Sequence, residues 1–359
     1  MTYRRAAVPV LTGGLVFVVL LWWAGQSIHA LGLSGADTMI DGQTYATLRQ
    51  WLLPWSYDGL GAGPGADYLR LLHTGLQVRY AAAFVFFVAG AVLLVHRMPP
   101  VRGRRVALLL VLWAWAQMAA TLALTVSAPW LLLASVRPSF RPLSRLSALI
   151  AAGHELPLFA GLVAAGVTAL IARLAIEDAE PPRPTAVTRR AARWAATAGT
   201  AVVAVSLLLL SYVAVAARIQ AFDPTAIGVL SEPGEFLRQW LLLGFWAGPD
   251  GASPGTWLLG RAADLLTLAV VWFTLRRLPA LLTRPTLPAL ALGGVCATVL
   301  GLMAGQLLRV LTTGSAPLQL VGTFATAYPS ALTFGLLAGL ATTLALHLTP
   351  TPAPANSQE

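Results

Sequence analysis

The chain of 359 residues is long enough for two ordinary soluble domains, but its composition excludes them. Hydrophobic residues make up 57% and charged residues 11% of the chain, and the mean hydropathy is +0.72. A typical soluble domain has about 25% charged residues, so a globule this apolar would lack a polar coat and needs lipid as its solvent. The single cysteine, Cys296, excludes a disulfide-stapled secreted fold.

Eight segments are long and apolar enough to cross about 30 Å of hydrocarbon as helices. The first follows Arg4 and Arg5 without a clear cleavage site, so we interpret it as a retained signal anchor. The sixth is the least apolar, because Arg261 and Asp264 stand near its start, where they can form an interfacial ion pair. The sequence thus predicts an all-α polytopic membrane protein with spans at 8–30, 76–95, 106–124, 149–174, 194–217, 256–275, 287–308 and 325–348.

The arginines are distributed unequally over the two sides of this predicted bundle. If the N-terminus is cytoplasmic, the cytoplasmic segments carry the whole formal net charge of +10, and the other side sums to zero. This is the positive-inside pattern, so we expect a bacterial plasma membrane protein with both termini cytoplasmic and arginines near anionic lipid head groups. The arginines lie in short loops without a recognition module, so no nucleic-acid partner is predicted.

Three short matches between distant parts of the chain indicate an internal duplication. They predict two parallel four-helix repeats, 1–180 and 194–348, because an even number of crossings gives both repeats one orientation. A Pro/Arg-rich cytoplasmic linker at 181–193 and a disordered tail at 349–359 complete the expected domain organisation. The matching segments are 48–53 with 237–242, 127–129 with 315–317, and 96–99 with 276–279.

Two long external loops follow the first helix of each predicted repeat, and each contains a short amphipathic helix. In the first loop, Asp41 or Thr44 can cap a helix that ends at Pro54. In the second, Ser231 can cap the helix and Pro233 suits an early helical position.

Each of these loop helices carries a tryptophan on its apolar stripe and an arginine that points away from it. Trp51 and Trp240 are the stripe residues, and Arg49 and Arg238 face water or a phosphate. We expect the helices to lie flat at the outer interface, either as lids over a site between the repeats or as a shield with tryptophans in the head-group belt.

His154 and Glu155 open the fourth predicted span and place a base and an acid near the outer membrane surface. His29 and His73 lie near the same surface, so the group could form an acid/base or metal site. The spacing lacks a His-Glu-x-x-His motif and a cysteine pair, so neither a metal nor a cofactor is predicted. The simpler interpretation is that Glu155 complements the positive end of a helix dipole.

Two further sets of polar residues are candidate binding groups. Arg137, Arg141 and Arg145 follow one another at intervals of four in one external loop and could hold an anionic lipid or phosphate, or face solvent paired with loop aspartates. Gln117 and Gln306 fall one residue apart when the repeats are aligned, and could join the repeats or line a polar path between them.

Three functions follow from these candidates. We place first a non-catalytic scaffold or regulatory membrane component, in which the loop helices contact another membrane protein, because every candidate catalytic group has a simpler structural explanation. The alternative is a carrier or permease subunit for a small or lipid-like solute, with its site near Gln117 and Gln306. A second alternative is a membrane-embedded enzyme acting on a lipid-linked substrate at the outer leaflet through His154 and Glu155.

Overall fold

The structure is a computed structural model, and the part of it that can be described contains helices and their connections. Apart from one isolated bridge between Tyr212 and Trp246, no β-structure occurs among the described residues. Eight helices are long and apolar enough to cross a membrane, so the chain is a multi-pass membrane protein. The described residues are 3–31, 41–57, 66–98, 104–134, 142–175, 187–223, 233–249, 253–313 and 327–349.

The long helices follow the predicted spans, and seven shorter elements stand between them in the described part of the chain. The long helices are α1 (Tyr3–Gln26), α5 (Ala66–Arg97), α6 (Arg105–Leu133), α8 (Glu155–Leu174), α9 (Arg189–Ala204), α12 (Pro254–Leu281), α13 (Leu287–Thr313) and α15 (Tyr328–Leu348). The shorter elements are α2 (Ile28–Leu31), α4 (Gly42–Leu52), the 3-10 turn η1 (Leu53–Trp55), α7 (Pro142–Ala151), the π-helical turn η2 (Val205–Leu210), α10 (Val213–Gln220) and α11 (Gly234–Leu241).

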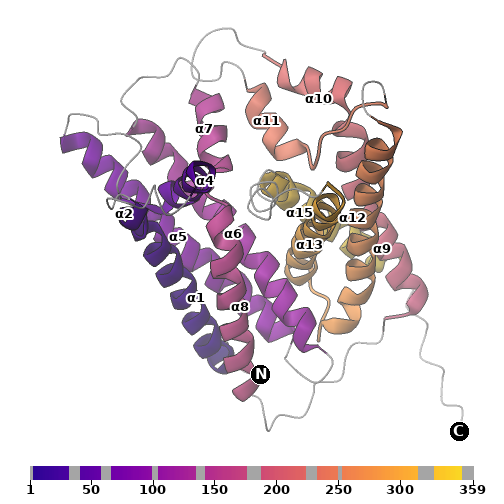
Figure 1. Ribbon diagram of the computed structural model, residues 1–359. Coiled ribbons are helices and arrows are strands. Elements are labelled where there is room, and N and C mark those ends of the chain that lie inside the picture. Colours follow the sequence, from indigo (N-terminus) through magenta and orange to yellow (C-terminus); the bar gives the residue numbers. More distant parts are fainter. Residues whose placement is uncertain are drawn as a thin grey trace, which may run out of the picture.

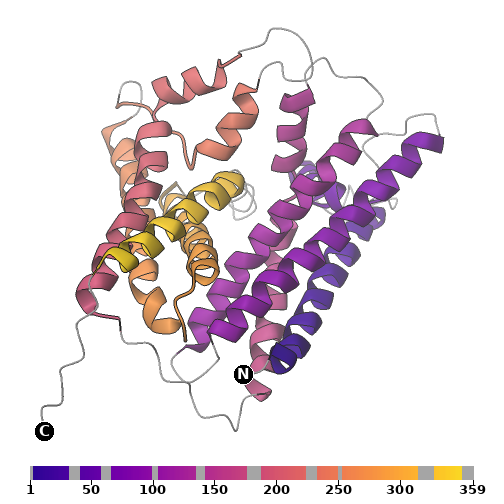
Figure 2. The ribbon, with the colours of Figure 1, turned by 180° about the vertical axis from the view of Figure 1, so that it is seen from behind.

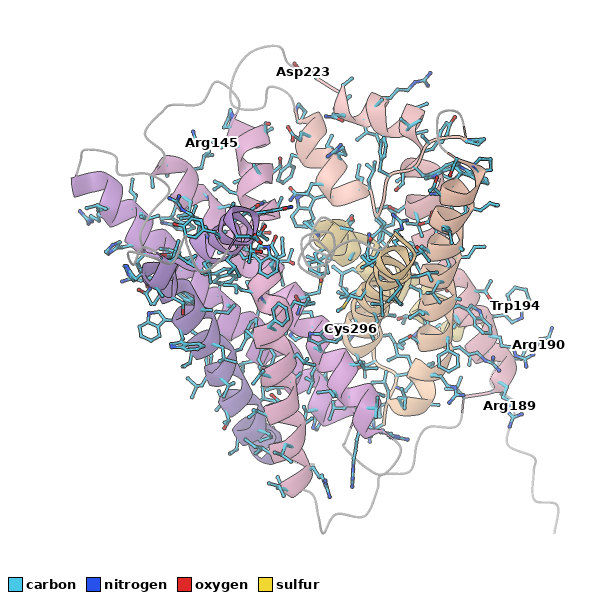
Figure 3. All side chains as sticks on the ribbon, viewed as in Figure 1. Arg145, Arg189, Arg190, Trp194, Asp223 and Cys296 are labelled. Carbon is cyan, nitrogen blue, oxygen red and sulfur yellow. The ribbon has the colours of Figure 1, made fainter. Side chains whose placement is uncertain are left out.

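The long helices form two groups of four that lie on opposite sides of the molecule in Figures 1 and 2. In the first group α1 and α6 each pack on α5 and α8; in the second group α9 and α13 each pack on α12 and α15. The two groups meet chiefly through α6 and α13. Cys296 of α13 lies in the middle of the molecule (Figure 3), where its Sγ is 3.5 Å from the carbonyl oxygen of Val111 on α6.

Large apolar side chains cover the outward faces of both groups. Leu15, Val85, Phe159 and Leu265 are each more than half exposed. In water such a surface would be unfavourable, whereas hydrocarbon solvates it, so these faces are the ones that contact lipid. Buried alanines and glycines line the helix contacts inside each group, which lets the backbones approach closely.

Two predicted spans are wrong in their bounds. The fourth was expected from residue 149, but α7 ends at Ala151 and α8 begins at Glu155, because Gly153 takes a left-handed backbone conformation (φ +89°) that breaks the helix. The fifth was expected to be continuous to 217. Instead α9 passes into the π-helical turn η2 (Val205–Leu210), which ends before the separate helix α10.

The predicted loop helices are present, with small differences at their ends. The N-cap Asp41 is confirmed: its carboxylate accepts a 2.7 Å hydrogen bond from the backbone N–H of Thr44, and this bond lowers the pKa of the Asp41 carboxyl. The chain continues past Pro54 through η1. Pro233 stands immediately before α11 rather than inside it, and Ser231 lies outside the described residues.

Candidate functional site

A cavity of about 430 Å³ opens between α7, α11 and α13, where the two groups of helices adjoin. We call it the seam cavity. In Figure 1, α7 and α11 stand side by side at the upper end of the molecule, with α13 and α15 beneath them. The cavity is large enough for a small organic molecule, since such sites typically measure about 300–1,000 Å³. Its polar lining residues are Ser147, Glu235, Arg238, Gln239, Gln306 and Arg309.

Two guanidinium groups reach the seam cavity from different helices. Arg238 is exposed on α11, and Arg309, whose side chain is 32% exposed, comes from α13. Within the described part of the chain, Arg238 donates to the side-chain oxygen of Gln220, at the long distance of 3.5 Å. Arg238 therefore keeps much of its hydrogen-bonding capacity for an anion.

Arg309 is held in place by a carboxylate at the back of the site. Its Nη2 donates to Oδ1 of Asp264, and Arg261 pairs with Oδ2 of the same residue at 2.8 Å. Asp264 is only 3% exposed and lies on α12, so the arginine is fixed relative to the second group. The expected ion pair between Arg261 and Asp264 is thus present, but the sequence did not reveal that Arg309 completes it.

Polar contacts join α7 to α11 along one wall of the seam cavity. The hydroxyl of Ser144 donates a 2.6 Å hydrogen bond to Oε2 of Glu235, and the amide of Gln239 donates to the carbonyl oxygen of Ser147 at 3.2 Å. These two bonds hold α7 against α11 and so fix the distance between the two helices. Among the described residues, the buried Oε1 atom of Gln239 has no hydrogen-bond donor.

We call the apolar part of the lining the floor of the seam cavity. The chain leaves α11 through Leu242 and Leu243, both buried, and continues to Phe245. The hydroxyl of Ser330, at the start of α15, donates to the carbonyl oxygen of Leu242 at 2.8 Å and anchors this turn. The lining of the site therefore combines cationic and apolar side chains.

The two predicted glutamines do not act together. Gln306 lines the seam cavity. Gln117 is fully buried in α6, and its amide donates to the carbonyl oxygen of Pro157 on α8 at 3.0 Å, within the first group. The sequence alignment of the repeats suggested a common site, but in the structure the two residues occupy different surroundings.

His154 and Glu155 are buried and do not line the seam cavity. Nε2 of His154 lies 2.7 Å from the carbonyl oxygen of Ile150, so this nitrogen carries the proton, and Nδ1 is 3.5 Å from Oγ1 of Thr121. Burial lowers the pKa of His154 to about 4, which keeps the ring neutral at physiological pH. The possible gathering of histidines at one surface does not form: His154 is buried whereas His29 and His73 are exposed, and no described group of His, Cys, Asp and Glu could hold a metal.

The remaining candidates are placed on the loops and loop helices. Arg137 and Arg141 lie outside the described residues, and Arg145 is half-buried on α7 at the upper end of the molecule (Figure 3). On α4, Arg49 is exposed and Trp51 is 6% exposed, so the tryptophan packs inside the protein. Trp240 is half-buried on α11.

Three residues that line the seam cavity were not among the sequence candidates: Glu235, Gln239 and Arg309. A fourth residue that the sequence analysis passed over is Arg79, which is buried in α5. Glu235 and Gln239 stand on the polar side of an amphipathic helix, where charged residues are ordinary. Arg79 offered a clearer signal, because an arginine inside an apolar span is costly unless it has a specific role.

No family model, no curated protein and no solved structure matches the chain. The function is therefore argued from the residues of the seam cavity.

Proposed function

We propose that the protein binds an anionic, lipid-like solute in the seam cavity and acts as a carrier or permease subunit. The observation that carries this proposal is that Arg238 and Arg309, on two different helices, line one cavity whose other lining residues are partly apolar. Guanidinium groups bind phosphate and carboxylate through paired N–H donors. The apolar floor suits the hydrocarbon part of the same solute.

The charges around the seam cavity favour an anion. Asp264 is shared by two arginines. Of the charged side chains that line the cavity, two are arginines, Arg238 and Arg309, and one is a carboxylate, Glu235. Arg238 has no carboxylate partner among the described residues. An incoming anionic head group would thus meet an excess of positive charge.

The orientation in the membrane is part of the proposal. We infer that the end with α7, α10 and α11 faces outward and that the opposite end is cytoplasmic. Arg189 and Arg190, at the start of α9, lie at that opposite end (Figure 3), and Arg104 there donates to the carbonyl oxygens of Ala280 and Leu281. Arginines at one end agree with the positive-inside rule.

We also infer that the two groups are related halves, 1–180 and 194–348, joined by 181–193. Both groups repeat the same pattern of helix packing, as described above. A matched contact adds to this: Gly13 of α1 faces Thr168 of α8, and Gly199 of α9 faces Thr342 of α15. Each of the two threonines also donates to the carbonyl oxygen four residues earlier in its own helix.

A carrier is favoured over a scaffold by the surroundings of the loop helices. A scaffold was expected to present the stripes of these helices to a partner protein. Trp51 is 6% exposed, and α11 packs on α7 and α15, so these faces are already occupied within the chain. The enzyme alternative has no supporting observation, since neither His154 nor Glu155 lines the seam cavity.

The proposal is tested by binding and transport with defined lipids. The detergent-purified protein should bind dihexanoylphosphatidic acid more tightly than dihexanoylphosphatidylcholine, measured by calorimetry. Arg238→Gln should weaken phosphatidic acid binding about tenfold, which corresponds to about 1.4 kcal/mol. Arg218→Gln, an exposed arginine of α10 that does not line the cavity, should bind like the wild type.

Transport separates the carrier from a binding or regulatory protein. Proteoliposomes containing the wild type should move the short-chain phosphatidic acid across the bilayer, and Arg238→Gln should reduce the rate. Equal binding of both lipids, or no effect of Arg238→Gln, would contradict the seam cavity as the site. Binding without transport would contradict the carrier and leave a regulatory role.

A further inference from the structure

Arg79 of α5 is a fully buried cation whose close partners are all neutral. Its side chain is 1% exposed. Nε donates a 2.9 Å hydrogen bond to the hydroxyl of Ser127 on α6, and Nη1 donates to the carbonyl oxygen of Pro54. The guanidinium carbon lies 5.6 Å from the ring centroid of Trp55. These contacts orient the guanidinium but do not neutralise it.

No carboxylate pairs with Arg79 in the part of the chain that the structure describes. Burying an unpaired ion costs several kcal/mol, so the missing counter-charge needs an explanation. Arg261 in the second group provides a comparison. It also stacks on a tryptophan, 4.5 Å from the ring centroid of Trp246, but it has Asp264 as its ionic partner at 2.8 Å.

A small cavity beside Arg79 offers room for the missing charge. It has a volume of about 50 Å³ and lies between η1, α5, α6 and α7. One water needs about 10–15 Å³, and a drug-sized ligand needs about 300 Å³ or more. Apart from Arg79 and Ser56, its walls are leucine, alanine and proline side chains. A monatomic anion with one or two waters fits this space, and a phospholipid head group does not.

We propose that Arg79 holds a single small monovalent anion, of the size of chloride, in this cavity. The apolar walls favour a halide over phosphate or sulfate, because multivalent anions lose more hydration energy on burial. The third guanidinium nitrogen, Nη2, has no hydrogen bond to the described residues and is the donor open to the anion. This site is separate from the seam cavity and does not depend on the proposed carrier function.

The anion also affects how the segment around η1 packs against α5. Leu53, Pro54 and Ser56 line the cavity, and Arg79 holds the carbonyl oxygen of Pro54. An anion at this point compensates the buried charge of Arg79 and so stabilises the arrangement in which Arg79 holds η1 against α5. Chloride should therefore stabilise the folded protein by mass action, since it binds only the assembled site.

The direct test is equilibrium binding of radioactive chloride to the detergent-purified wild type, with gluconate maintaining the ionic strength. We expect saturable binding that approaches one chloride per chain and is displaced by bromide. We also expect the melting temperature to rise when chloride replaces gluconate at constant ionic strength. Absence of saturable chloride binding would overturn the proposal, with water then filling the cavity.

Variants assign the bound chloride to Arg79. Arg79→Met should abolish binding and the chloride-dependent rise in melting temperature. Arg70→Met is the matched control, because Arg70 is an exposed arginine of the same helix and should retain both. If Arg79→Met does not fold, Arg79→Lys decides: its compact ammonium should weaken chloride binding at least tenfold. Wild-type affinity in either folded Arg79 variant would overturn the assignment.

Discussion

His154 and Tyr328 meet edge to face between the two groups of helices, with their ring centroids 5.4 Å apart. Each residue stands at the start of a long helix: His154 immediately precedes α8, and Tyr328 is the first residue of α15. Both side chains are 1% exposed. The imidazole therefore acts as a neutral packing group that joins the two groups of helices, and its protonation would place a charge at this junction.

Stability should fall in mild acid because of His154. Its pKa is lowered by burial from 6.5 to about 4, and the positive charge of Arg79 acts in the same direction. Above pH 6.5 the ring is neutral in the folded and unfolded chain. As the pH falls from 6.5 to about 4, only the unfolded chain takes up the proton, so the free energy of unfolding decreases by up to about 1.4 kcal/mol per pH unit.

The measurement is the melting temperature in detergent from about pH 7 to about pH 5. His154→Phe keeps an aromatic ring against Tyr328 but cannot titrate, so its melting temperature should depend less on pH. His73→Phe is the control, because His73 is exposed and should leave the wild-type pH dependence unchanged. An unchanged acid sensitivity in His154→Phe would show that another group is responsible.

Gly153 should resist substitution, since its backbone and its surroundings both require glycine. Its φ is +89°, and an added Cβ would lie 2.6 Å from Cβ of Pro54. We expect Gly153→Ala to lower the free energy of unfolding by about 1–3 kcal/mol. Gly166→Ala, in α8 with open space around it, should be neutral or stabilising. Thermal unfolding of both variants checks this, and wild-type stability in Gly153→Ala would contradict it.

The spans could be predicted from the sequence because length and apolarity are local properties of a helix. The N-cap at Asp41 was also predictable, since a cap depends on residues three positions apart. The break at Gly153 was not, because a glycine permits a left-handed conformation without requiring it. Hydropathy alone therefore extended the fourth span backwards into α7.

A site between the repeats was among the sequence-based predictions, but most of the lining of the seam cavity could not be predicted, because its residues come from segments far apart in the chain. Glu235 and Ser144 meet through tertiary packing, and so do Arg309 and Asp264. Arg238 and Gln306 were selected from the sequence for position and polarity, and both line the cavity. Gln117 was selected by the same reasoning, but its partner is a carbonyl within the first group, because a buried amide bonds to the nearest free acceptor.

Matched double variants test whether the two groups are related halves. An added Cβ on Gly13 would lie 1.8 Å from Oγ1 of Thr168, so Gly13→Ala should destabilise the protein and Thr168→Ala should restore much of the loss. In the second group, Gly199→Ala should also destabilise the protein, and Thr342→Ala should restore part of that loss. Thermal unfolding of the four single and two double variants measures both couplings. If the two groups are related halves, the coupling energy should have the same sign in both glycine–threonine pairs. Coupling in only one pair would count against this relationship.

Removing Asp264 should affect stability and binding in opposite directions. Asp264→Asn leaves Arg261 and Arg309 without their shared counter-charge, so we expect a loss of about 3–5 kcal/mol, reduced by the partial exposure of the two arginines. The same change removes the negative charge beside Arg309 at the seam cavity, so anionic lipid should bind several-fold more tightly.

Melting temperatures and calorimetric affinities for dihexanoylphosphatidic acid measure the two effects. Glu235→Gln is the control for stability only: it removes an exposed carboxylate from the same cavity but keeps an oxygen that can accept from Ser144, so it should also tighten lipid binding while changing stability by less than about 0.5 kcal/mol. Weaker lipid binding by folded Asp264→Asn would mean that Arg309 needs its carboxylate to point into the cavity, which would contradict a purely electrostatic role.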